Sequence, residues 1–136
     1  ALFVAVSVCL FGCGKKGPPV PPRHTAIPAV KDLDSSIDGD TVVLTWTIPG
    51  KTENKSAGIK GFVLHKSKQK TTDGDCRNCP VNFSPVAEVS AETKLPGEKM
   101  NYTERLEKGF KYVFKVIAIS SGGTESSDSN YAEILF

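Results

Sequence analysis

The sequence predicts an all-β domain in which two sheets pack face to face, and three observations support this fold class. Short runs rich in Val, Ile, Thr and aromatic residues alternate with clusters of Gly, Pro, Asn, Asp and Ser, as strands alternate with turns. No segment repeats its apolar residues at the 3.6-residue period of an amphipathic helix. The 136 residues are enough for one domain with a hydrophobic core of its own.

Seven runs have the length and composition of strands, which is the number typical of an immunoglobulin-like sandwich. They cover residues 29–33, 41–48, 61–66, 84–90, 100–105, 111–120 and 130–135. Between the first two, Asp38-Gly39 is a dipeptide that favours a tight hairpin turn. Strand alternation places Val42, Leu44 and Trp46 on one face of the second run, so we expect this face to enter the core.

The stretch from Leu106 to Ala118 resembles the fibronectin type III signature around two neighbouring strands. The matching residues are Leu106, Gly109, Tyr112, Phe114, Val116 and Ala118, and Lys108 stands where the family usually has Pro. Trp46 also matches the Trp of an earlier strand of that family, and segments 59–64 and 122–126 resemble a further strand and loop. The resemblance implies a seven-stranded fibronectin-type-III-like sandwich over residues 27–136, with the Tyr112 hydroxyl bonded to the backbone near Leu106.

The first twelve residues are apolar or small apart from Ser7. As a helix they would span about 18 Å, which is shorter than a bilayer requires, and they are predicted to be a signal peptide that lacks its start. Leu10-Phe11-Gly12-Cys13 resembles the bacterial lipobox, in which the Cys sulfur accepts a diacylglyceryl group. The resemblance implies that residues 1–12 are removed and that Cys13 anchors the chain to a membrane.

Residues 13–26 are rich in Pro and predict an extended tether between the lipidated Cys13 and the domain. By resemblance to enterobacterial lipoproteins, Gly14 after the Cys implies the outer membrane, with the domain facing either the periplasm or the cell surface. The segment from Cys13 to Pro18 also resembles the N-terminus of a small lipoprotein that assists assembly of the lipopolysaccharide-export translocon. An accessory role in that translocon is therefore an alternative function.

Cys76 and Cys79 are separated by two residues in a polar segment, and an oxidising compartment favours a disulfide between them. A thiol redox protein is the alternative, but it would need a helix N-terminus to lower the pKa of the first thiol. A zinc site would need two further ligands, and covalent haem would need His where Pro80 stands. We expect a disulfide rather than a metal or cofactor.

The remaining features argue against several classes of function. A net charge of +2 without a basic helix argues against nucleic-acid binding. The sequence contains neither a Ser nucleophile elbow nor a phosphate-binding Gly loop, so we expect no catalytic residues and no enzyme activity. The carboxylates of Asp32, Asp34, Asp38 and Asp40 invite a calcium site, but the terminal Glu of such a loop is missing.

One outward-facing set of residues is unusually apolar and is our candidate binding surface. It contains Val63, His65, Val113, Lys115, Ile117 and Ile119. A solvated sheet face normally carries polar residues at these alternate positions. We expect this face to bind an unidentified envelope protein or a second copy of the chain, unless the tether or the loop at 71–83 covers it.

Overall fold

The computed structural model describes residues 27–50, 58–71 and 81–136. The predicted signal peptide, the predicted lipidation site Cys13, the predicted tether, and Cys76 with Cys79 lie outside these residues, so the expectations for them remain predictions. No helix in the described part is long and apolar enough to cross a membrane.

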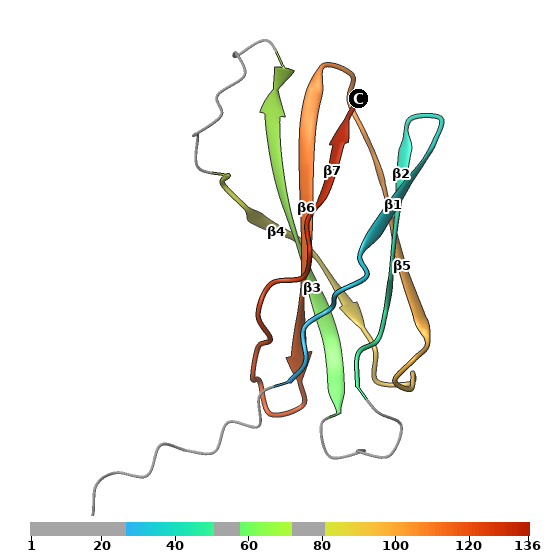
Figure 1. Cartoon of the computed structure of the whole chain (residues 1–136), viewed down its shortest axis with the longest axis vertical. Helices are drawn as coiled ribbons and strands as arrows, with labels where there is room; N and C mark the ends of the chain where they lie inside the picture. The colour runs from blue at the N-terminus through green and yellow to red at the C-terminus, as the bar shows by residue number, and fades with distance from the viewer. Residues whose placement is uncertain (1–26, 51–57, 72–80) are drawn as a thin grey trace, which may run out of the picture.

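The described residues form seven strands in two antiparallel sheets, which confirms the predicted fold class (Figure 1). The strands are β1 (Asp34–Asp38), β2 (Thr41–Thr47), β3 (Ile59–Lys70), β4 (Ser84–Ser90), β5 (Lys99–Arg105), β6 (Phe110–Ser120) and β7 (Ala132–Leu135). One sheet has the order β1-β2-β5 and the other the order β4-β3-β6-β7.

The core lies between the two sheets and contains the faces that the alternation predicted. Val42, Leu44 and Trp46 of β2 are fully buried, and Phe62 and Leu64 of β3 face them from the other sheet. The rings of Trp46 and Phe62 meet edge to face, with centroids 5.5 Å apart. Such a pair stabilises the contact beyond the area that it buries.

The predicted tyrosine corner is present at the start of β6. The Tyr112 hydroxyl accepts a hydrogen bond from the Glu107 amide at 2.8 Å and donates to the Glu107 carbonyl at 3.4 Å. Glu107 follows the predicted Leu106 directly. The expected hairpin turn is also present, because Gly39 connects β1 to β2 with a φ of 63°, which glycine adopts without strain.

The first strand lies further along the chain than expected. Residues 29–33 form no ladder, and β1 begins at Asp34 instead. Ile27, Val30 and Leu33 are all buried, and their spacing of three does not match the two-residue period of a strand. The segment is held by Asn130, whose side-chain oxygen accepts from the Leu33 amide at 2.9 Å and whose nitrogen donates to the Leu33 carbonyl at 2.8 Å.

The last strand is shorter than the predicted run because serine hydroxyls take the place of backbone carbonyls beside β6. The Val116 amide donates to Ser129 Oγ at 2.8 Å, and the Ala118 amide donates to Ser126 Oγ at 2.9 Å. The amides of β6 are satisfied in this way. A regular ladder with β7 is confined to the four residues from Lys111 to Phe114.

Two of the four aspartates that suggested calcium bind residues distant in sequence. Asp32 accepts the Thr47 amide at 3.0 Å, and Asp40 accepts two bonds from the Arg105 guanidinium. The Arg105 guanidinium holds the pKa of Asp40 below its usual value. Within the described ranges, no group of three or more His, Cys, Asp or Glu residues is placed to hold a metal ion.

Candidate functional site

The six candidate binding residues lie on β3 and β6, which are neighbours in the middle of the four-stranded sheet. The register pairs Val63 with Ile117, His65 with Lys115, and Gly61 with Ile119. Alternation points these side chains away from the core, because Phe62 and Leu64 between them face inward. The six residues therefore share the outer face of this sheet.

This outer face is not equally accessible along its length. Val113 is only 4% exposed, so the expectation that it contributes to an open apolar surface is wrong. Ser67, its partner across the ladder, is buried as well. The other five candidate residues are partly exposed.

Two aromatic side chains from opposite edges of the sheet explain this burial. Phe83 directly precedes β4 and Tyr131 directly precedes β7, yet their ring centroids are 5.2 Å apart. Edge strands of a four-stranded sheet lie about 14 Å apart, so both side chains must reach over the middle strands. The register continued by one residue puts Phe83 level with Ser67, the residue that pairs with Val113.

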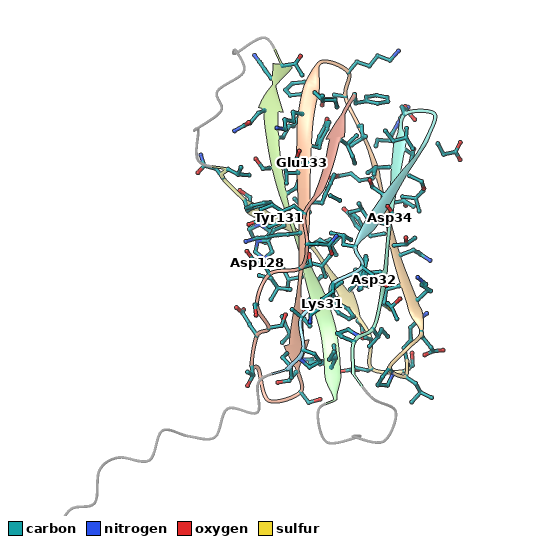
Figure 2. The ribbon with its side chains drawn as sticks, viewed as in Figure 1. Lys31, Asp32, Asp34, Asp128, Tyr131 and Glu133 are labelled. Atoms are coloured by element: carbon teal, nitrogen blue, oxygen red, sulfur yellow. The ribbon has the colours of Figure 1, made fainter. Side chains whose placement is uncertain are left out.

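Lys115 is enclosed by the same cluster. Its Nζ lies 3.1 Å from Asp128 Oδ2 and 4.4 Å from the centroid of the Phe83 ring. The Tyr131 hydroxyl contacts the same Asp128 oxygen at 3.4 Å, and Figure 2 shows these two side chains side by side. The Lys115 side chain is 14% exposed. The Asp128 carboxylate therefore balances the Lys115 charge, and the ammonium group has little contact with solvent.

The apolar residues among these five are Val63, Ile117 and Ile119, and we call them the apolar strip. All three side chains are partly exposed. Glu88 of β4 pairs with Val63 on one side of the strip, and Glu125 forms a bridge with Ile119 on the other side. Both glutamates lie on the margins of the strip, so an apolar centre is bounded by negative charge.

Sequence reasoning did not identify Phe83, Asp128 and Tyr131 as parts of this face. The alternation of β7 contains a signal for Tyr131, because it stands two residues before the outward Glu133. No local signal pairs it with Phe83, which lies 48 positions earlier (131 − 83). The contact depends on the order of the strands in the sheet.

No known family model matches the sequence, and no curated protein matches it. Solved structures do match the fold. The third fibronectin III domain of a human protein is 12% identical with a TM-score of 0.50, and the match covers 88% of this chain and 92% of that one. A structure described as a myokine is 15% identical with a TM-score of 0.50, covering 81% and 97%.

A pectate lyase from Pectobacterium carotovorum is 14% identical with a TM-score of 0.51, and the match covers 80% of this chain but only 27% of the lyase. At these identities the likeness concerns the fold alone. The chain forms a fibronectin-type-III-like β-sandwich of three and four strands.

Proposed function

We propose that this protein is a non-enzymatic interaction module of the bacterial cell envelope. In this proposal the acylated Cys13 anchors it to the outer membrane, and the apolar strip contacts a partner protein. Fibronectin-type-III-like domains serve as binding or structural modules, so the fold is compatible with this role without specifying it. The observation that carries the proposal is the pairing of Val63 with Ile117 at the centre of an outward sheet face.

The chemistry of the strip favours a particular kind of partner. Apolar side chains that adjoin one another across two strands form a continuous surface, and such surfaces mark interfaces more often than isolated exposed residues do. Glu88 and Glu125 at its margins favour a partner whose contact surface has an apolar centre and basic residues around it. The enclosed cluster of Phe83, Lys115 and Tyr131 limits the surface at its other end.

Replacing Ile117 by Lys should abolish partner binding while the domain stays folded. The new cation would lie in the apolar strip, but its aliphatic stem can lie along the sheet with the amine in solvent. The loss of strand propensity costs about 1 kcal/mol or less. To measure binding, a photo-crosslinking amino acid replaces Val63, and the protein is irradiated in cells. The crosslinked adduct with the partner is then compared with and without Ile117→Lys.

Thr45→Lys is the matched control, because Thr45 is an outward residue in the middle strand of the other sheet. The adduct should persist in this control and disappear in Ile117→Lys, with both variants unfolding at denaturant concentrations near that of the wild type. An adduct that survives Ile117→Lys would exclude the apolar strip as the binding surface. Val113 is unsuitable for the test because it is buried.

Cys13→Ser should remove the membrane anchor. A processed lipoprotein carries acyl chains whose burial contributes about 0.8 kcal/mol for each methylene, which is sufficient for stable attachment. The wild-type protein should therefore incorporate a palmitate analogue and fractionate with outer membranes on a density gradient. The Cys13→Ser protein should do neither, whereas Cys9→Ser, four positions earlier (13 − 9), should do both. Membrane attachment of Cys13→Ser would contradict lipid anchoring at this residue.

A further inference from the structure

The strand β5 forms one edge of the three-stranded sheet, and among the residues that the structure describes it pairs with β2 alone (Figure 1). The Ile48 amide donates to the Glu98 backbone carbonyl at 2.9 Å, and the Leu106 amide donates to the Asp40 backbone carbonyl at 2.7 Å. Glu98 and Leu106, on either side of β5, therefore both belong to hydrogen-bonded pairs. In an antiparallel ladder, hydrogen-bonded pairs alternate with non-bonded pairs. The residues of β5 whose amides and carbonyls point away from β2 are therefore Lys99, Asn101, Thr103 and Arg105.

The other three sheet edges in the described part carry features that hinder addition of a strand. β1 has five residues with an Asp at each end, and β7 has only four residues. β4 contains Pro85 and a register shift in its pairing with β3. Short strands, prolines, bulges and charges are the usual means by which proteins protect sheet edges. β5 has seven residues in unbroken register with β2, and only its two ends are charged on the outer face.

The inward side of this edge contains a carboxylate that lacks a second partner. Glu104 Oε1 lies 2.9 Å from Lys66 Nζ, but the buried Oε2 receives no hydrogen bond within the described residues. A buried acceptor without a donor is destabilising. Tyr102 lies beside it, and partial burial together with the Glu104 charge raises the pKa of its hydroxyl. A basic side chain on an added strand, opposite Glu104, would supply the missing donor.

The outward side indicates the charge of the partner. Lys99 and Arg105 at the two ends of β5 pair with Asp32 at 3.9 Å and Asp40 at 2.8 Å, but their side chains are still 73% and 84% exposed. In an antiparallel pair of two copies centred on Tyr102, Lys99 of each copy would lie opposite Arg105 of the other copy. Like charges directly opposite one another destabilise a ladder, whereas carboxylates at these two positions would stabilise it. The edge therefore favours an acidic segment of a different protein over a second copy.

We propose that the free edge of β5 binds an extended polypeptide segment as an added antiparallel strand. The segment carries carboxylates opposite Lys99 and Arg105 and a basic residue opposite Glu104. This surface lies on the sheet that does not contain the apolar strip, so the proposal is independent of the function proposed above. Main-chain bonds supply affinity in this mode of recognition, and the side chains supply selectivity.

A capped, fluorescent peptide Asp-Lys-Thr-Val-Thr-Val-Asp tests the proposal against the full Cys13→Ser chain. Aligned antiparallel, its Asp residues face Arg105 and Lys99, and its Lys faces Glu104. The amides of both its Thr residues point toward β5, and that of the first Val points away. We expect saturable binding by fluorescence anisotropy. N-methylation of both Thr amides should weaken it about tenfold or more, while N-methylation of the first Val should not.

Variants of the protein provide the complementary comparison. Thr103→Pro removes an amide that points away from β2, so the β2 ladder stays intact while peptide binding is lost. Thr103→Ala keeps that amide and should bind as the wild type does. If Thr103→Pro does not fold, the N-methyl peptides decide the question alone. Equal binding of both N-methyl peptides, no saturable binding, or loss of binding in Ile117→Lys would each overturn the proposal.

Discussion

Trp46→Ala is expected to leave the domain unfolded or molten under native conditions. Trp46 is fully buried between the sheets and packs edge to face on Phe62. Cutting a buried aromatic residue to Ala costs about 3–5 kcal/mol, because transfer energy is lost and a cavity remains. The total stability of a typical domain is about 5–15 kcal/mol, so this loss is a large share of it.

Trp46→Phe is the matched control for this experiment. The Trp46 Nε1 atom is buried without a hydrogen-bond partner in the described part of the chain. Replacing Trp46 by Phe therefore breaks no hydrogen bond and removes an unsatisfied donor. Far-ultraviolet circular dichroism in a urea titration is the appropriate measurement, because Trp46 is the only Trp and its fluorescence disappears in both variants. A Trp46→Ala midpoint within error of the wild type would show that the core does not depend on this residue.

Gly61→Ala is expected to destabilise the domain although it adds only one methyl group. A Cβ built on Gly61 would lie 2.7 Å from the backbone oxygen of Val89, on the neighbouring strand β4. That oxygen belongs to the ladder, so relief of the clash requires β4 to move. Overpacking of this kind costs about 1–3 kcal/mol.

Gly122→Ala separates this clash from the general effect of replacing a glycine. The nearest atom to its added Cβ would be Ser120 Oγ at 3.8 Å, which is ordinary contact. The expected change is within about 0.5 kcal/mol of the wild type. Urea midpoints of both variants provide the comparison. Equal midpoints would mean that β4 moves at no cost in the free energy of unfolding. The close approach of Gly61 to the Val89 backbone would then not affect stability.

The sequence by itself determined the strands of the core and their inward faces. The two-residue alternation from Val42 to Trp46 is a local property, and it holds in whichever sheet the strand lies. The tyrosine corner was also predictable, because Tyr112 and its backbone partner are five residues apart. The hairpin turn at Gly39 was predictable for the same reason, because it depends on the neighbouring residues Asp38 and Gly39 alone. Local patterns failed at residues 29–33, where Asn130 from the far end of the chain holds the segment.

Only the tertiary structure decided which parts of the surface are open. Val113 belongs to the predicted outward face, but Phe83 and Tyr131, which precede the two edge strands, meet over the sheet, and Val113 at the level of Phe83 is buried. The free edge of β5 likewise follows from strand order and from the register with β2. Strand order and register are set by packing between residues distant in sequence, whereas the alternation within one strand is set by neighbouring residues. The core was therefore predictable from the sequence, while access to its outer faces and edges was not.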